Sequence, residues 1–289
     1  MTDFVVSEEQ AKQRLDIYVV TKMPELSRAF IRRLCDTGKI TVNGIEVKAG
    51  YKLKAGESVQ VDYDLKQLDE IPDIKLPVLY EDDDCLVIDK PVGVLTHSKG
   101  EFNPEATVAT FLRSYLKDME GSRAGIVHRL DRATSGVIIC AKNQAALSWL
   151  QKQFSQRKAK KTYVAIVQGS MRENEALIDM PIERNPKAPA TFRVGVNGKH
   201  AKTHYKVLET NNSYSLLELK PETGRTHQLR VHLAQLGHPI VGDTIYGGKP
   251  AERLYLHAHQ LELTLPSRDR KTFTSPVPPE FARTIERDA

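Results

Sequence analysis

A short polar run near the middle of the chain brings together residue types that can do acid–base or nucleophilic chemistry. It places Asp131 among three basic or potentially basic side chains, His128, Arg129 and Arg132. The apolar segments 126–127 and 137–139 on either side predict two buried strands, with the polar run as the turn between them. A carboxylate beside arginines stays ionised and can act as a base or a nucleophile. The alternative is a structural Asp–Arg pair that braces the loop.

Two later segments contain groups that could serve such a carboxylate. Tyr163 lies in an apolar run after the basic segment 157–161, a place that also suits an ordinary core tyrosine. Farther along, Arg225 precedes a helix predicted to begin near His227, and Arg230 lies in its first turns. Either guanidinium can bind a carboxylate through two hydrogen bonds, so both are candidates for that pairing.

Several histidines permit a competing interpretation as a metal site: His227, His232, His238, His257 and His259. His227 and His232 are five positions apart, so they do not share one face of a helix. His257 and His259 would point to the same side of a strand, which is weak support for a site. The acidic run 81–84 has no further ligand at suitable spacing and predicts a solvated turn. We therefore predict structural histidines, no metal and no other cofactor.

Composition excludes some classes of protein. The chain has 289 residues, of which 40% are hydrophobic and 27% charged, as expected for a globular protein of one or two domains. It has no apolar run of the length that spans a bilayer and no signal-peptide core, which predicts a cytoplasmic protein without a membrane partner. Three cysteines without C-x-x-C spacing, Cys35, Cys85 and Cys140, are expected to be reduced and buried. The net charge of +5 does not by itself indicate nucleic-acid binding.

The first 63 residues predict a small unit of two helices and a short sheet. The first helix is expected at 13–22, and the second from an N-cap at Ser27 to a stop at Gly38. Asn-Gly between two alternating segments is a strong hairpin signal. Strands are therefore expected at 40–42, 45–47 and 58–63.

Basic residues concentrate on the second helix and just after it, at Arg28, Arg32, Arg33 and Lys39. Arg28 and Arg32 are four apart and project from the same side of the helix. They could face a nucleic acid, or they could be ordinary solvated side chains. Residues 64–77 lose periodicity and gain two prolines, which predicts a linker.

Residues 78–289 alternate strands and helices without a regular βαβ repeat. A hairpin is expected at 78–80 and 85–88, helices along the apolar stripes 108–119 and 147–154, and strands at 161–168, 202–209 and 214–220. This pattern predicts an α+β domain with a mixed, largely antiparallel central sheet flanked by helices and loops.

Three of these segments, 128–136, 161–169 and 223–243, resemble in sequence and order the motifs of the RluA-type pseudouridine synthases. The resemblance extends from about Leu79 to the segment 276–279. The first sixty or so residues are similar to a second family, the S4-type RNA-binding domain. The combination implies an S4-like domain at 1–63, a linker at 64–77 and a pseudouridine synthase domain at 78–289.

The resemblance implies an enzyme that isomerises specific uridines in RNA to pseudouridine. It implies that Asp131 is the catalytic carboxylate, that Tyr163 stacks on the base and takes part in proton transfer, and that Arg230 pairs with Asp131. It implies RNA contacts for a larger basic set: Arg129, Arg225, Arg28, Arg32, Arg33, Lys39, Lys158, Lys160 and Lys161. Whether Asp131 attacks the sugar, attacks the base or removes a proton is left open.

The pairing of an S4 domain with this catalytic domain implies large-subunit ribosomal RNA as the substrate, with transfer RNA as the alternative. A catalytically silent RNA-binding protein and a metal-dependent hydrolase are the competing functions. The absence of Asp131, Tyr163 or a suitable arginine would have favoured the binding protein, and all are present. The chain is expected to act as a monomer.

Overall fold

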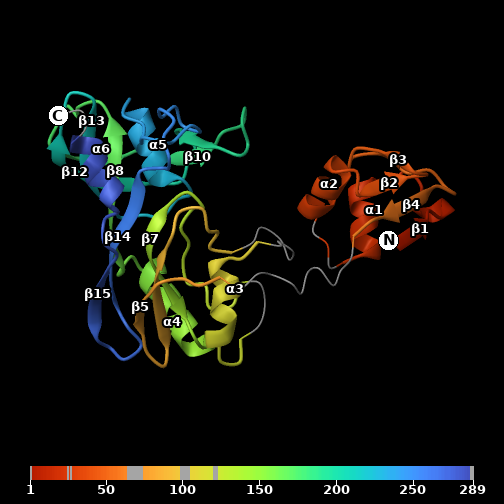
Figure 1. The fold of residues 1–289 in the computed structure, drawn as a ribbon, viewed down its shortest axis with the longest axis horizontal. Coiled ribbons are helices and arrows are strands. Elements are labelled where there is room, and N and C mark those ends of the chain that lie inside the picture. Colours follow the sequence, from red (N-terminus) through yellow and green to blue (C-terminus); the bar gives the residue numbers. More distant parts are fainter. Residues whose placement is uncertain are drawn as a thin grey trace. The chain divides into compact units, whose positions relative to one another are not determined.

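The structure, a computed structural model, describes residues 2–24, 26, 28–63, 74–97, 105–119 and 123–286. The chain divides into two compact units, Met1–Ile74 with His97–Phe111, and Lys75–Thr96 with Leu112–Ala289 (Figure 1). Ser27 and most of the predicted linker, 64–73, lie outside the described residues. In the part of the chain that is described, no helix is long and apolar enough to cross a membrane.

Up to residue 63, the described part of the smaller unit contains two α-helices and a four-stranded antiparallel sheet. The helices are α1 (Leu15–Lys22) and α2 (Arg28–Asp36), after a short 3-10 turn, η1 (Glu8–Gln10). The sheet has the order β1-β4-β2-β3, with β1 at Thr2–Val5, β2 at Ile40–Val42, β3 at Ile45–Glu46 and β4 at Ser58–Val61. Both helices and strands β2 to β4 match the predicted segments, whereas β1 was not predicted.

Local chemistry accounts for the hairpin and for the joining of the two helices. Asn43 and Gly44 both have positive φ, 51° and 76°, as a tight two-residue hairpin turn requires. Asp16 of α1 is buried and accepts hydrogen bonds from Arg14 and from Arg28 of α2. These arginines lower the pKa of Asp16 to about 2, although burial opposes them. Arg28 therefore ties α2 to α1.

The larger unit contains a nine-stranded sheet. Its order is β5-β6-β7-β14-β8-β13-β12-β9, with β15 pairing on β14. The strands are β5 (Val78–Glu81), β6 (Cys85–Lys90), β7 (Ser135–Ala141), β8 (Lys160–Gln168), β9 (Glu175–Asp179), β12 (Lys202–Thr210), β13 (Tyr214–Pro221), β14 (Leu256–Thr264) and β15 (Arg270–Thr274). All neighbours are antiparallel except β7 and β14. The predicted mixed, largely antiparallel sheet of an α+β protein is confirmed.

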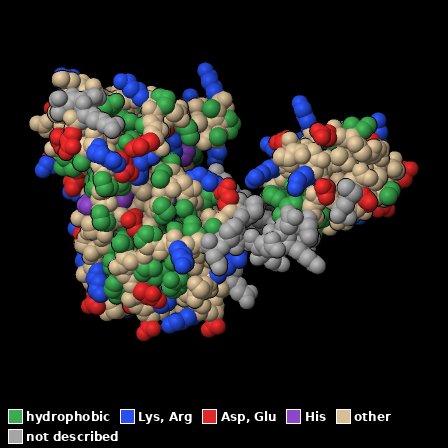
Figure 2. Space-filling view, in the orientation of Figure 1, with side chains coloured by type: hydrophobic (Ala, Val, Ile, Leu, Met, Phe, Trp, Pro, Cys, Tyr) green, Lys and Arg blue, Asp and Glu red, His purple; other side chains and the backbone are tan. Residues whose placement is uncertain are grey.

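Helices and a second, two-stranded sheet flank this nine-stranded sheet. They are α4 (Gln144–Ser155), α5 (Gln228–Gln235), α6 (Pro279–Glu286) and the pair β10 (Ile182–Arg184) and β11 (Phe192–Val194). Earlier in the chain, the short helix α3 (Val108–Leu112) is followed directly by the 3-10 turn η3 (Arg113–Tyr115). One hydrophobic core includes Ile139, Leu150 of α4 and Leu261. Another includes Ile166, Leu233 of α5 and Phe281 of α6. Basic and acidic side chains are interspersed on the visible face of each unit, in keeping with the modest net charge (Figure 2).

Two predicted elements of this region are wrong in extent. The stripe 108–119 predicts a continuous helix, but α3 ends at Leu112 and η3 is followed by extended backbone at Leu116. The next residue, Lys117, donates its backbone N–H to the carbonyl of Lys142, so the chain leaves the helix for a tertiary contact. The segment 126–127 is not a strand. Ile126 makes a single bridge to Cys140, and the side chain of His128 accepts the backbone N–H of Ile139 in β7.

The parallel contact between β7 and β14 is short and close. Only Ser135 with His257 and Gly136 with Ala258 are paired. Gly136 has φ of 115°, and a Cβ atom there would lie 2.2 Å from the carbonyl oxygen of Ala258. A glycine is therefore required at this position. The loop that precedes β7 is thus held beside the middle of the sheet, where β14 meets β8.

Candidate active site

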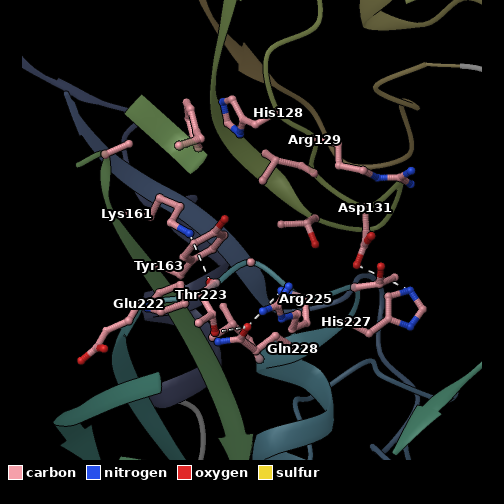
Figure 3. Close-up of a pocket in the computed structure, with 18 of the residues that line it drawn as sticks. His128, Arg129, Asp131, Lys161, Tyr163, Glu222, Thr223, Arg225, His227 and Gln228 are labelled. Atoms are coloured by element: carbon pink, nitrogen blue, oxygen red, sulfur yellow. Dashed lines mark hydrogen bonds and ion pairs between the residues drawn. The ribbon is translucent and has the colours of Figure 1, made fainter. Parts of the chain in front are cut away.

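A pocket of about 630 Å³ lies in the larger unit (Figure 3). The Asp131 loop, the first half of β8 and the start of α5 supply its walls, with Phe154 and Arg157 from the end of α4 and beyond. Such a volume is typical of a site for a small molecule or one extruded nucleotide. The three residues for which catalytic roles were predicted, Asp131, Tyr163 and Arg230, all line this pocket.

The loop that bears Asp131 is fixed by backbone hydrogen bonds on both sides of that residue. The Asp131 carbonyl accepts from the Thr134 N–H at 3.0 Å. Leu130 exchanges two hydrogen bonds with the buried hydroxyl of Thr96, at 2.8 and 3.1 Å. The Asp131 side chain is 22% exposed and lies near His227, the residue before α5, and Arg230 of α5. A carboxylate held in this way has a defined position but is still reachable from the pocket.

A buried lysine lies behind the same loop. The ammonium group of Lys90 is fully buried and donates to the carbonyl oxygens of Pro91 and Val94 at 2.9 and 2.8 Å, and to that of Arg132 at 3.4 Å. Burial lowers the pKa of Lys90 to about 8, although the charge of Asp131 opposes the shift. This lysine was not singled out from the sequence, and its bond to Arg132 helps to fix the Asp131 loop.

Arg230 is a buried cation with two carboxylate partners. Its Nε and Nη2 atoms donate to the two oxygens of Asp243, each at 2.7 Å, and its Nη1 atom lies 3.8 Å from Asp131 Oδ2. Its guanidinium also lies over the Tyr246 ring, 5.0 Å from the centroid. Burial alone would lower the pKa of Arg230, but Asp243 outweighs it and raises the pKa. The short bidentate pair is with Asp243, so the predicted pairing with Asp131 is the longer of the two contacts.

Tyr163 and Lys161 lie next to each other on the same face of β8 (Figure 3). Burial raises the pKa of the Tyr163 hydroxyl, and the negative charge of Asp131 raises it further, so Tyr163 is a neutral phenol. Lys161 Nζ donates to the carbonyl of Thr223 at 3.2 Å, and burial lowers the pKa of Lys161 to about 8. The pocket thus offers an aromatic ring opposite the carboxylate and an amine beside that ring.

His128 has a different role from the one its place in the sequence suggests. Its Nε2 atom accepts the backbone N–H of Ile139 at 3.1 Å, and its ring stacks on Phe154 with centroids 4.5 Å apart. Burial, with a smaller contribution from Lys161, lowers the pKa of His128 to about 3. The prediction that His128 is a potential cation beside Asp131 is wrong, because the ring is neutral and is turned towards β7.

The neutral His128 should make the larger unit sensitive to acid. Between about pH 6.5 and pH 3 the unfolded histidine binds a proton and the folded one does not, so the free energy of unfolding falls as the pH falls, by at most about 1.4 kcal/mol per pH unit. His128→Gln keeps an acceptor for Ile139 but cannot titrate. Urea unfolding at several pH values should give a shallower slope for this variant in that window. Equal slopes for the two proteins would contradict the assignment.

The residues predicted to bind RNA fall into three groups. The pocket is lined by Arg129, Arg225 and Lys161, and also by Arg157. The side chains of Lys158 and Lys160 are exposed and do not line it. Arg225 donates to the carbonyl of His200 at 3.0 Å, and the Arg129 side chain extends away from Tyr163 (Figure 3). In the smaller unit, Arg32, Arg33 and Lys39 are exposed, and Arg28 is bound to Asp16 at 2.7 Å.

Besides Lys90, three residues of the site were missed by reasoning from sequence: His227, Asp243 and Tyr246. Asp243 ends the segment 223–243, but nothing in its spacing indicates that it is the partner of Arg230. His227 was expected to be structural, and its ring lies between Asp131 and Tyr246. Tyr246 follows this segment and carries no sequence signal of its own. Each was missed because its role depends on a contact across the fold.

The other histidines that were considered as metal ligands contact protein atoms. His232 contacts the Thr203 hydroxyl and the Met180 carbonyl, and His238 contacts the carbonyl of Gln168. His257 and His259 both contact Ser275. Within the described ranges, no group of three or more His, Cys, Asp or Glu side chains is placed to hold a metal ion.

Comparison with known families identifies the chain. A family model described as RNA pseudouridylate synthase matches residues 84–235, which is more than half of the 289 residues. The chain belongs to the RNA pseudouridylate synthase family. The enzyme is therefore an isomerase, an RNA pseudouridine synthase. A second model, the S4 domain, matches residues 13–59 of the smaller unit, so the enzyme also carries an N-terminal S4 domain.

Two relatives each align with more than 90% of the chain. An uncharacterized RNA pseudouridine synthase of Synechocystis is 36% identical, covering 97% of this chain and 90% of the relative. Ribosomal large subunit pseudouridine synthase D of Yersinia pestis is 37% identical, covering 91% of this chain and 86% of the relative. Among solved structures, human RNA pseudouridylate synthase domain containing 1 superposes with a TM-score of 0.60 at 31% identity, over 71% of this chain and 85% of that one.

Proposed function

We propose that this enzyme converts uridines of large-subunit ribosomal RNA to pseudouridine, with Asp131 as its catalytic carboxylate and without a cofactor. The observation that carries the proposal is the meeting in one pocket of Asp131, the ring of Tyr163 and the buried cation of Arg230. The names of relatives, such as ribosomal large subunit pseudouridine synthase D of Yersinia pestis, support this substrate class. The S4 domain supports an RNA substrate in general.

The reaction fits the chemistry that these side chains supply. The bond between N1 of uracil and C1′ of ribose breaks, a bond between C5 and C1′ forms, a proton leaves C5 and a proton is gained at N1. There is no change of redox state and no group is lost, so a cofactor is not required by the balance of the reaction. Asp131 supplies the oxygen that acts as nucleophile or base, and the guanidinium of Arg230 lies 3.8 Å from it.

The pocket must also retain the detached uracil while it turns. Tyr163 provides a flat, neutral surface on which the base can stack. The target nucleotide must leave its RNA stack to enter, at a cost of a few kcal/mol. Arg129, Arg157 and Arg225 at the pocket can contact the phosphates beside it, which positions the RNA without reading its sequence.

The substrate class can be tested with the purified enzyme. Large-subunit ribosomal RNA transcripts and transfer RNA transcripts are incubated with it, and pseudouridine is mapped in both at single-nucleotide resolution. We expect pseudouridine at a small number of positions in the ribosomal RNA. Pseudouridine in transfer RNA alone would contradict the proposed substrate, and pseudouridine in neither would contradict the proposed function on these substrates.

The stacking role of Tyr163 predicts a contrast between two substitutions. Tyr163→Ala removes the ring and should weaken binding of the flipped uridine by about 1–3 kcal/mol, measured as the dissociation constant of a short substrate RNA with Asp131→Asn in the background to prevent turnover. Tyr163→Phe keeps the ring and should bind with nearly unchanged affinity. Tyr80→Phe, in β5 and away from the pocket, serves as the control. Equal affinities for the Ala and Phe variants would argue against stacking.

A further inference from the structure

We propose that His227 is a positioning residue, which donates from Nε2 to the Asp131 carboxylate and is held in the required tautomer by Tyr246. The proposal rests on the proposed function, because it concerns how the same pocket prepares its catalytic carboxylate. His227 was expected from the sequence to be only structural, and nothing in the balance of the reaction requires it. The contacts of its ring are what indicate a role.

The backbone at His227 turns its side chain towards Asp131. His227 is the residue before α5 and has φ of 56° and ψ of 19°, the left-handed conformation. Residues other than glycine adopt this conformation uncommonly, and such positions gather at functional sites. The result is a ring that faces Asp131 (Figure 3), with its Nε2 atom 3.6 Å from Asp131 Oδ2. Its Nδ1 atom lies 2.7 Å from the Tyr246 hydroxyl. Phe192 packs edge-on against the ring, with centroids 5.7 Å apart.

The hydrogen bonds of Tyr246 decide which nitrogen of His227 carries the proton. The Tyr246 hydroxyl accepts the backbone N–H of Phe192 at 3.0 Å, and it has one proton to donate. Burial raises the pKa of Tyr246, so the hydroxyl keeps that proton. In the proposed arrangement the hydroxyl donates this proton to His227 Nδ1, which lies 2.7 Å away. A neutral histidine that accepts at Nδ1 has its proton on Nε2, so an N–H group faces Asp131.

Both contacts of the Asp131 side chain that the structure gives fall on the same oxygen. His227 Nε2 and Arg230 Nη1 lie 3.6 and 3.8 Å from Oδ2. These distances are longer than hydrogen bonds, and catalytic hydrogen bonds commonly shorten only when the substrate is bound. Two donors on Oδ2 set the rotation of the carboxylate and direct Oδ1 to the reacting atoms. Without His227, Arg230 alone would hold Oδ2, and Arg230 is already engaged by Asp243.

Two substitutions of His227 separate this role from a structural one. His227→Asn suits the left-handed backbone and keeps a polar atom near the place of Nδ1, but it is too short to reach Asp131. His227→Gln places an amide N–H near the place of Nε2. We expect the single-turnover rate of pseudouridine formation at saturating RNA to fall about 10- to 100-fold for His227→Asn, and to recover most of that loss for His227→Gln. The dissociation constant for RNA should change little in both.

Other outcomes would overturn the proposal. A rate for His227→Asn close to wild type would show that the ring does not position Asp131. Equal losses for the Asn and Gln variants would indicate a structural role only. Tyr246→Phe provides a second variant that leaves His227 in place: it should lower the rate several-fold, and long-range proton–nitrogen NMR should show the proton on Nε2 in the wild type and a mixture of tautomers in this variant. A wild-type ring with its proton on Nδ1 would contradict the argument.

The same experiment distinguishes this proposal from the proposed function. If the wild type forms pseudouridine and Asp131→Asn does not, the function stands whatever the His227 variants do. If the wild type forms none in ribosomal or transfer RNA, the function fails before His227 is tested. Thermal unfolding of each variant, compared with the wild type, verifies that a lost rate does not come from a lost fold.

Discussion

Asp131→Asn is expected to abolish pseudouridine formation, lowering the single-turnover rate by about 10³-fold or more. The amide has nearly the same shape as the carboxylate but lacks its charge, so it can be neither base nor nucleophile in this reaction. The rate is measured at saturating RNA, with pseudouridine counted directly in the product. The affinity for RNA should be retained, because the residues expected to contact phosphates are unchanged.

The fold should survive this substitution. Arg230 keeps its two short hydrogen bonds to Asp243, so this buried cation still has a carboxylate partner. Asp83→Asn is the matched control, since Asp83 lies in the turn between β5 and β6 with its side chain 99% exposed. It removes one carboxylate from the same unit and should leave the rate unchanged. Retained turnover in Asp131→Asn would exclude Asp131 as the catalytic group.

Elements defined by local chemistry could be predicted from the sequence. The Asn43-Gly44 turn requires positive φ at both positions, and few other residue pairs supply it as easily. Strands β8 and β13 are runs of apolar or alternating residues, and the start of α5 was placed within a residue of its observed position. In each case the information lies within a few neighbouring residues.

Elements that depend on distant contacts could not be predicted. Strand β1 is short and largely exposed, and it is a strand because it pairs with β4, more than fifty residues later. The stripe 108–119 has the period of a helix, but the bond from Lys117 to Lys142 interrupts it. The order β7-β14-β8 joins segments far apart in the chain, and no periodicity records which strands will be neighbours.

In the candidate site, too, features that depend on neighbouring residues could be predicted, whereas contacts between distant residues could not. The residue types and spacing around Asp131 suggested a charged carboxylate, but they pointed to cations in its own loop. His128 of that loop binds β7, and the groups that contact the carboxylate are His227 and Arg230, almost a hundred positions later. The resemblance to known motifs pointed to Arg230, whose Nη1 atom lies 3.8 Å from Asp131 Oδ2. It could not indicate that the buried carboxylate of Asp243 lies closer to Arg230 than Asp131 does.

The Arg230–Asp243 pair should be essential to both stability and activity, and a pair of substitutions can separate the two effects. Arg230→Gln leaves the carboxylate of Asp243, whose side chain is fully buried, without its cation. Removing one member of a buried ion pair typically lowers the free energy of unfolding by about 3–5 kcal/mol. Trp149, the chain's single tryptophan, lies in α4 and reports urea unfolding of the larger unit by fluorescence. The same variant should also lose most of its rate.

Combining Arg230→Gln with Asp243→Asn removes both charges and allows the two amides to bond to each other. The double variant should regain much of the lost stability, since no buried charge is left uncompensated. Its rate should stay low, because no guanidinium then faces Asp131. If activity returned together with stability, Arg230 would act only as part of the fold. If stability did not differ between the single and the double variant, the buried pair would not be the reason for the loss.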